Sequence, residues 1–175
     1  MNAAKSIVLI GMMGAGKSSV GRALEQRTGL SRLDTDETLA VQFGMPITEI
    51  FAKRGEEQFR DAETEALRNI EPDRAKIIVT GGGIILRPEN VELLKRLGTI
   101  VWLNADEMTL FERASRRSTR PLLQKDNPRA MFSELFGKRL PLYKAAADFE
   151  VDTSKLDNDQ VADKILSKME ELAAR

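Results

Sequence analysis

The chain has 175 residues, with 27 Lys and Arg against 27 Asp and Glu and therefore no formal net charge. This length fits one compact domain spanning residues 1–175, and the balanced charge argues against a general nucleic-acid-binding protein. Cysteine and histidine are both absent, which excludes disulfides, thiolate or imidazole metal ligands, and cysteine or histidine catalysis. Any bound metal must therefore have oxygen ligands, which favours magnesium.

Short apolar runs alternate along the chain with longer segments of helical periodicity. The apolar runs predict strands at residues 6–10, 31–34, 76–80, 99–103 and 149–151. The periodic segments predict helices at residues 17–28, 35–43, 56–70, 88–97, 108–114, 128–146 and 159–173. The strands are almost continuously apolar, which is typical of a parallel sheet buried on both faces. We therefore predict an α/β fold with helices covering the sheet.

A glycine-rich segment follows the first predicted strand. Gly-Met-Met-Gly-Ala-Gly-Lys-Ser at residues 11–18 matches the pattern G-x-x-x-x-G-K-[ST], between a strand and a helix as that pattern requires. Backbone amides of such a loop surround phosphate oxygens, and the helix N-terminus adds its positive dipole end. We expect Lys17 to reach the β- and γ-phosphates of a nucleoside triphosphate and Ser18 to offer its hydroxyl to Mg²⁺. The alternative is a tight turn without a ligand.

Two aspartates stand at the end of the second predicted strand, in Asp34-Thr35-Asp36. Ligands of open α/β sheets bind beyond the carboxyl ends of the strands, so we expect both carboxylates beside the phosphate loop. One of them can orient water around Mg²⁺ while the other holds an acceptor hydroxyl. The alternative is structural, because Asp34 or Thr35 could cap the helix that follows.

Three consecutive glycines, Gly81, Gly82 and Gly83, follow the third predicted strand. Glycines at this place present backbone amides to a ligand and leave no side chain in its way. An ordinary turn is the alternative, since glycine runs are common in loops.

Arginines are the candidate anion-binding residues. Arg60 and Arg139 lie on predicted helices, where either residue alone would ordinarily be solvated. Four more arginines are clustered before Pro121, namely Arg113, Arg116, Arg117 and Arg120. A nucleic-acid patch is one interpretation of this cluster. Phosphoryl transfer, however, requires cations that close over the γ-phosphate, and the fixed donor fork of arginine suits that task. We therefore interpret residues 116–127 as a mobile loop that serves as a lid.

Taken together, these segments resemble the shikimate kinase family. The shared motifs are the loop at 11–18, Asp-Thr-Asp at 34–36, Phe-Arg at 59–60, Gly-Gly-Gly at 81–83, Arg-Pro-Leu-Leu at 120–123 and Arg-Leu-Pro-Leu-Tyr at 139–143. The resemblance implies a three-layer P-loop kinase fold of the nucleoside-monophosphate-kinase type, with a five-stranded parallel sheet flanked by helices. A substrate-binding helical region at about residues 34–61 and a lid at about residues 112–125 are also implied. The implied reaction transfers the γ-phosphoryl group of ATP to the 3-hydroxyl of shikimate, in aromatic amino-acid biosynthesis through chorismate.

The resemblance also implies roles for individual positions. Lys17, Asp36 and Arg120 are the implied catalytic residues, with Asp36 binding the acceptor hydroxyl and acting as its base or orienter. Asp34 is implied near Mg²⁺ through water. The implied shikimate ligands are Asp36, Arg60, Gly82 and Arg139. The implied ATP-binding residues are Gly14, Ala15, Gly16, Lys17, Ser18, Ser19, Arg113 and Arg120, with Arg113 against the adenine.

Two other functions stay open. Another small-metabolite P-loop kinase, for gluconate or a nucleoside monophosphate, would share the donor site. A non-catalytic ATP-binding module would share the scaffold, although such modules typically lose residues that are present here as Lys17, Asp36 and Arg120. The expected partners are ATP and shikimate, with Mg²⁺ as the cofactor.

The chain lacks signals for a membrane or for export. No apolar run approaches the ~18 residues of a membrane span, and the N-terminal segment has no secretory apolar region. We therefore expect a cytoplasmic monomer that binds neither membranes nor nucleic acids.

Overall fold

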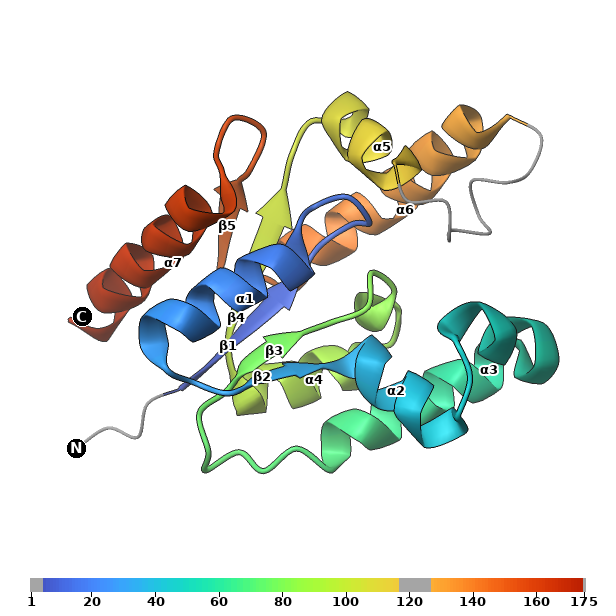
Figure 1. The fold of residues 1–175 in the computed structure, drawn as a ribbon, viewed down its shortest axis with the longest axis horizontal. Coiled ribbons are helices and arrows are strands. Elements are labelled where there is room, and N and C mark those ends of the chain that lie inside the picture. The colour runs from blue at the N-terminus through green and yellow to red at the C-terminus, as the bar shows by residue number, and fades with distance from the viewer. Residues whose placement is uncertain (1–4, 117–126, 175) are drawn as a thin grey trace.

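A computed structural model describes residues 5–116 and 127–174 (Figure 1). The strands are β1 (Ser6–Ile10), β2 (Arg32–Asp34), β3 (Ile77–Val79), β4 (Gly98–Asn104) and β5 (Phe149–Asp152). The helices are α1 (Lys17–Thr28), α2 (Thr35–Phe43), α3 (Ile47–Arg68), the short 3₁₀ helix η1 (Ile84–Leu86), α4 (Pro88–Leu97), α5 (Glu107–Ser115), α6 (Pro128–Ala146) and α7 (Asn158–Ala173). Every strand and helix predicted from the sequence is present, and only the start of α3 differs by more than two residues.

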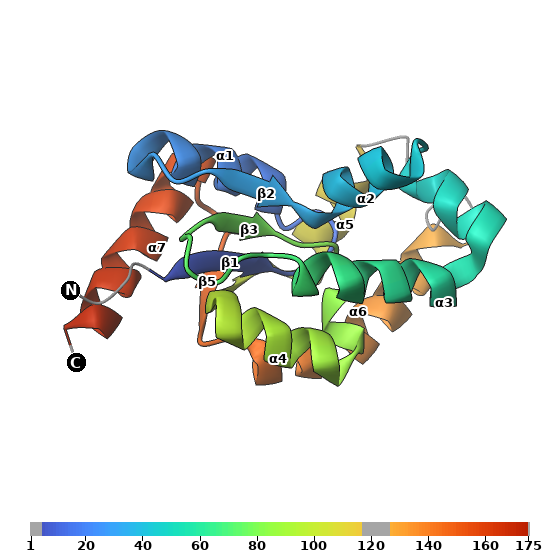
Figure 2. The same ribbon diagram turned by 90° about the horizontal axis from the view of Figure 1, so that it is seen from below.

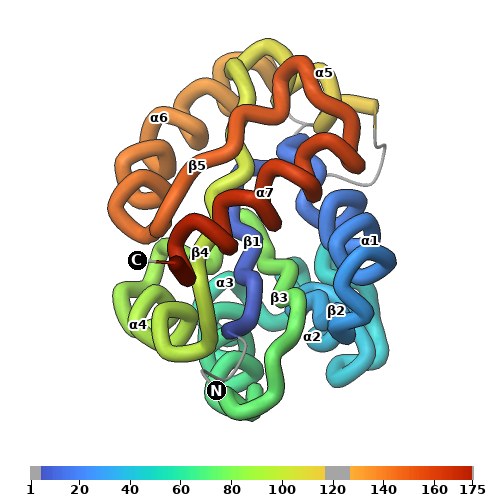
Figure 3. The backbone as a smooth tube through the Cα atoms, turned by 90° about the vertical axis from the view of Figure 1, so that its left-hand side faces the viewer, coloured from blue at the N-terminus to red at the C-terminus, as the bar shows by residue number. Residues whose placement is uncertain are grey.

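The strands form one parallel sheet in the order β2-β3-β1-β4-β5. Helix α1 lies on one face of this sheet with α7 packed beside it, and α4 and α6 lie on the opposite face (Figures 2 and 3). All five residues of β1 are buried, as a central strand covered on both faces requires. The predicted three-layer α/β fold with a five-stranded parallel sheet is confirmed.

The carboxyl ends of three strands meet at one edge of the sheet. Strand β1 leads into the glycine-rich loop, β2 ends at Asp34, and β3 ends shortly before Gly81. In the sheet register Val79 lies beside Leu9 on one side and beside Asp34 on the other. Parallel pairing therefore brings together three segments that are far apart in the sequence.

Helix α3 differs from its prediction. The sequence predicts a helix over residues 56–70, whereas α3 begins at Ile47 and is interrupted at Gly55, where φ is +81°. Glycine adopts this backbone conformation readily, so the chain bends there and then resumes its helix. The segment before the bend packs on α2 in a small core that is separate from that of the sheet, formed by Leu39, Ile50 and Phe59. The two helices project past the sheet edge as a unit (Figure 1).

Two local features help to stabilise the fold. Trp102 on β4 is only 2% exposed and belongs to the sheet core. Asp157 and Gln160 form a reciprocal capping box at the start of α7, in which each side chain accepts a hydrogen bond from the backbone amide of the other. Across residues 5–116 and 127–174, no helix combines the length and apolar character needed to span a bilayer.

Candidate active site

The loop between β1 and α1 has a backbone suited to phosphate. Gly14 and Gly16 both have a φ of +87°, a conformation in which a residue with a Cβ is strained. Helix α1 begins directly after Gly16, so its N-terminal amides and the positive end of its dipole lie next to the loop. The positions expected to bind ATP, residues 14–19, form this turn and the first residues of α1. The segment therefore provides amide donors and a positive dipole end at one place.

Lys17 is held across the same loop. Its ammonium group donates to the carbonyl oxygens of Gly11 at 2.7 Å and Met12 at 3.2 Å. The side chain is only partly buried, so solvent or a ligand can reach it. These contacts keep a positive charge at the end of β1, where the sequence analysis expects phosphate groups.

Asp34 makes two kinds of contact through its two carboxylate oxygens. Oδ1 caps α2 by accepting from the amides of Asp36 at 3.0 Å and Glu37 at 3.3 Å. Oδ2 accepts from the Ser18 hydroxyl at 3.4 Å and lies 3.6 Å from the Arg32 guanidinium. The capping alternative is therefore correct for one oxygen, while the other oxygen faces the start of α1.

Ser18 and Asp34 form an oxygen donor set that suits Mg²⁺. Within residues 5–116 and 127–174, no group of three or more acidic side chains could hold a metal ion by itself. Magnesium in phosphoryl-transfer sites commonly has only one or two protein ligands and completes its shell with water and substrate phosphates. One hydroxyl and one carboxylate oxygen beside the phosphate loop fit a cation of this kind.

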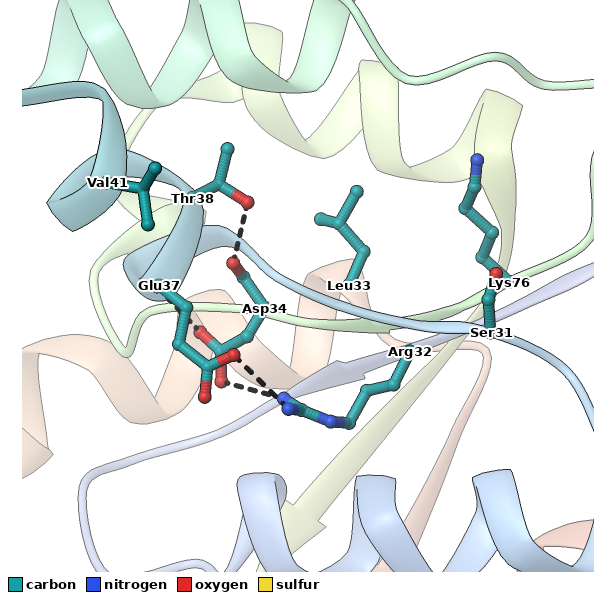
Figure 4. A pocket seen from close by; sticks show the side chains of 8 residues that line it. All are labelled: Ser31, Arg32, Leu33, Asp34, Glu37, Thr38, Val41 and Lys76. Atoms are coloured by element: carbon teal, nitrogen blue, oxygen red, sulfur yellow. Dashed lines mark hydrogen bonds and ion pairs between the residues drawn. The ribbon is translucent and has the colours of Figure 1, made fainter.

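A groove of about 430 Å³ runs along β2 on the outer side of the sheet (Figure 4). Its lining residues are Ser31, Arg32, Leu33, Asp34, Glu37, Thr38, Val41 and Lys76. Here Arg32 bridges Asp34 to Glu37, which lies 3.2 Å from the guanidinium. Lys17, Arg60 and Arg139 do not line this groove, so it is not the place where the predicted donor and acceptor groups converge.

The triple-glycine loop uses its carbonyl groups and leaves two amides available. The Gly81 amide donates to the Thr35 hydroxyl at 3.2 Å. The carbonyls of Gly81 and Gly83 accept from η1, and the Gly82 carbonyl accepts from the Tyr143 hydroxyl. In the part of the chain that the structure describes, the amides of Gly82 and Gly83 donate to no protein acceptor. They are therefore free to bind a ligand.

Lack of space for a side chain, and not an unusual backbone angle, explains Gly81 and Gly83, whereas a Cβ on Gly82 would make only ordinary contacts. None of them has a positive φ. A Cβ on Gly81 would lie 2.7 Å from Asp36 Oδ1, one on Gly82 would lie 3.5 Å from Arg139 Nη1, and one on Gly83 would overlap the Arg60 guanidinium. The loop thus lies against three predicted site side chains, which come from α2, α6 and α3.

Arg60 and Arg139 are buried, so the solvated alternative is wrong for both. Each is only 8% exposed. Arg60 donates to Glu63 at 2.7 Å, and its guanidinium lies 5.2 Å from the centroid of the Phe59 ring. A buried guanidinium requires compensating charge, which an anionic ligand also provides.

Glu63 borders the predicted site, although no sequence motif pointed to it. Its side chain is fully buried on α3, one Oε pairs with Arg60, and the other has no hydrogen-bond partner. That free oxygen faces the glycine loop, because a Cβ on Gly81 would lie 3.1 Å from it. Burial raises the pKa of Glu63, while Arg60 opposes the shift and the Asp36 charge adds to it. The available sequence signal is the three-residue spacing from Arg60, which places both residues on one helix face.

Of the two arginines predicted to bind ATP, only Arg113 lies within the described residues. The Arg113 guanidinium donates to the hydroxyl and the carbonyl oxygen of Thr153, each at 3.0 Å, and so joins α5 to the segment after β5. Its predicted contact with adenine stays a prediction. Arg120 lies outside the described residues, as do Arg117 and most of the predicted lid at 112–125.

The residues predicted to bind the phosphate donor and those predicted to bind the acceptor meet at the carbonyl oxygen of Gly11. This oxygen accepts from Lys17, and a Cβ on Gly82 would lie 3.5 Å from it and equally far from Arg139 Nη1. Asp36 and Arg60 border the neighbouring glycines of the same loop. The arrangement can therefore hold an anionic small molecule through arginines while placing it beside a phosphate-binding loop.

Comparisons with known proteins identify the family of this chain. The model of the shikimate kinase family matches residues 13–170. A shikimate kinase of Thermodesulfovibrio yellowstonii is 46% identical over 169 residues, which covers 97% of each chain. The structure of a shikimate kinase from Acinetobacter baumannii in complex with shikimate is 35% identical, with a TM-score of 0.92 over 98% of this chain and 96% of that one. A gluconokinase from Sinorhizobium meliloti, at 19% identity and a TM-score of 0.57 over 99% of this chain and 96% of that one, shares the fold alone. The chain belongs to the shikimate kinase family.

Proposed function

We propose that this chain transfers the γ-phosphoryl group of ATP to the 3-hydroxyl of shikimate, and that two sets of residues divide the work. The phosphate loop and Lys17 form the donor side. The side chains around the triple glycine form the acceptor side. Family membership supports the reaction, and the shared position of the two sides beside Gly11 supports the division of roles.

The observation that carries the proposal is the burial of Arg60 and Arg139 beside two unused amides. Buried cations are costly unless a negative group compensates them. Among the described residues, Glu56 and Glu63 both pair with Arg60, and no ion pair is formed by Arg139. The carboxylate of shikimate would supply the negative group that Arg139 lacks, with Gly82 adding a backbone contact. Arginine suits this task because its donor fork matches the two oxygens of a carboxylate.

Asp36 takes the central role on the acceptor side. Its half-buried carboxylate borders Gly81, at the junction of the acceptor cluster and the end of β2. In this position it would accept a hydrogen bond from the attacking hydroxyl, orient its lone pair and receive its proton. Phosphoryl transfer asks little other covalent chemistry of a protein, so positioning and charge neutralisation carry the catalysis.

On the donor side, the loop amides and Lys17 would neutralise the β- and γ-phosphates. Ser18 and, through water, Asp34 would hold Mg²⁺, which supplies charge neutralisation of the phosphate oxygens when bound. Arg113 would lie against the adenine, and Arg120 would reach the phosphates from the lid. Water exclusion by such a lid would limit hydrolysis of ATP.

We further propose that the protein works as a monomer in the cytoplasm. Both sides of the proposed site belong to a single chain, which supports activity without a partner subunit. Sedimentation of the active protein at micromolar concentration checks this proposal, and a stable dimer would contradict it.

The test compares ATP consumption with shikimate, gluconate and nucleoside monophosphates for the wild-type chain and for Asp36→Asn. We expect turnover with shikimate only, and a loss of about 10³-fold in the variant, because the hydroxyl loses its proton acceptor. ATP affinity should be unchanged, since Asp36 lies on the acceptor side. Turnover with one of the other acceptors alone would refute the substrate, and unchanged turnover in the variant would remove Asp36 from the mechanism.

A further inference from the structure

Tyr143 connects helix α6 to the triple-glycine loop and to the phosphate loop. It lies on α6, one helical turn after Arg139, and is fully buried. Its hydroxyl donates to the Gly82 carbonyl at 2.5 Å and lies 4.0 Å from the sulfur of Met12 in the phosphate loop. Its ring stacks on Trp102, with centroids 6.1 Å apart and planes 16° apart. Packing therefore fixes the ring, and the hydroxyl is directed at the glycine loop.

The hydroxyl is a permanent donor. Burial raises the pKa of Tyr143 to about 12, against opposing effects of Arg139 and Arg60. A neutral phenol has one proton to donate, and the Gly82 carbonyl is the nearest acceptor. The Gly82 oxygen is consequently occupied across the physiological pH range.

This hydrogen bond determines where the neighbouring amide points. In a trans peptide the carbonyl of one residue and the amide of the next point in opposite directions, and the structure contains no cis peptide among its described residues. Holding the Gly82 carbonyl toward α6 therefore turns the Gly83 amide away from α6. Glycine peptides rotate more freely than others, so without this anchor the loop would populate several orientations.

The backbone of α6 constrains the positions of Arg139 and Tyr143 less strongly than an uninterrupted helix would. Pro141 lies between Arg139 and Tyr143 and cannot donate a hydrogen bond to the carbonyl four residues earlier. The relative position of the two side chains thus depends more on what they contact outside the helix. For Tyr143 those contacts are Trp102 and Gly82.

We propose that Tyr143 is a positioning residue of the acceptor site. Its hydroxyl fixes the orientation of the Gly82–Gly83 peptide and thereby holds the glycine loop in a defined position relative to the Arg139 guanidinium. This inference rests on the proposed function, because it concerns the same acceptor. It predicts a contribution to shikimate affinity that is separate from the contribution of the tyrosine ring to packing.

The experiment compares Tyr143→Phe with Ser6→Ala and Arg139→Met in the full chain. Ser6 is the matched control, since it is a buried residue whose hydroxyl accepts from the Lys76 amide at 3.0 Å at the opposite end of β1. Calorimetric titration gives the Kd of shikimate, steady-state kinetics give both KM values, and thermal unfolding gives the Tm. We expect Tyr143→Phe to raise the Kd and KM of shikimate about tenfold while the KM of ATP changes less than about twofold.

The outcomes separate the inference from the proposed function. If Arg139→Met keeps full affinity for shikimate, the proposed acceptor site itself is wrong. If Arg139→Met loses affinity and Tyr143→Phe does not, only the role of Tyr143 is wrong. Equal increases in the two KM values of Tyr143→Phe, or the same loss of shikimate affinity in Ser6→Ala, would mean general destabilisation and would also overturn the inference.

A second measurement needs no substitution. Tyr143 is the only tyrosine of the chain, so biosynthetic incorporation of 3-fluorotyrosine labels this residue alone. We expect its ¹⁹F resonance to shift when shikimate saturates the protein, because the ligand changes the field and packing at Gly82 and Arg139. A resonance that does not respond to saturating shikimate would contradict the positioning role.

Discussion

The proposed donor and acceptor sides of this site are built in different ways. The donor side is one continuous segment, in which positive-φ glycines and the start of α1 provide backbone amides and Lys17 supplies the charge. The proposed acceptor side gathers the half-buried Asp36 of α2 and buried charged side chains of α3 and α6 around a glycine loop in which Gly81 and Gly83 leave no room for a side chain. Backbone donors bind any polyphosphate, whereas a particular arrangement of side chains selects one acceptor. The difference implies that substitutions on the two sides should change different kinetic constants.

The largest effect is expected from Lys17→Ala. Removing the ammonium group should lower kcat with shikimate by about 10³-fold or more, because the charge that develops on the transferred phosphoryl group loses a close cation. ATP turnover with and without shikimate checks this, and equilibrium titration should show that shikimate still binds. The control is Lys95→Ala, which removes an exposed lysine that pairs with Glu92 on α4. Near wild-type turnover in Lys17→Ala would refute its place on the donor side.

A smaller and more selective effect is expected from Arg60→Met. The KM of shikimate should rise about 30-fold, as for the loss of a charge-assisted hydrogen bond, while the KM of ATP stays nearly constant. The Tm should also fall, because Glu63 would be left buried without its cation. Arg68→Met on the same helix is the matched control, since Arg68 is half exposed and pairs with the surface residues Glu65 and Glu89. Equal effects in the two variants would show that Arg60 has no specific role at the acceptor.

The contrast between a continuous donor segment and an acceptor side assembled from distant helices also explains what could be predicted from the sequence. The donor loop is a local pattern of eight residues at 11–18, and its geometry follows directly from glycine and helix chemistry. Parallel strands end at a common edge, so the nearness of Asp34 and Gly81 to that loop was also predictable.

The features that could not be predicted from the sequence depend on packing between distant segments. The first half of α3 was missed because Gly55 interrupts its periodicity, and the segment is stabilised mainly by a small core shared with α2. The sequence placed Arg60 and Arg139 on helices but could not give their burial, which is set by how α3 and α6 pack beside the loop. For Asp34 the sequence left open a helix cap or a place beside the phosphate loop. Both are present, because one carboxylate oxygen caps α2 and the other contacts Ser18.

Glu63 provides the most discriminating test of the acceptor side, with the smallest expected effect. Its pKa is raised in the folded chain, chiefly by burial, so the folded state holds this proton more tightly than the unfolded state, where the ordinary value is 4.5. Its contribution to stability is therefore full below pH 4.5 and is lost as the pH rises through the higher folded pKa. Asp36, Arg60 and Arg139 are the charges that face it. The amide of Glu63→Gln does not titrate in this range.

The free energy of unfolding of the wild type minus that of Glu63→Gln should accordingly fall as the pH rises from 4.5 toward 8. Urea unfolding of both proteins at several pH values measures the difference. Glu57→Gln removes an exposed carboxylate from the same helix and gives the background effect of losing one acidic charge. A difference that grows with pH would mean that Arg60 and Arg139 stabilise the Glu63 carboxylate more than burial disfavours it. The acceptor side would then be electrostatically complete without a bound anion, and the argument that its buried arginines await a carboxylate would fail.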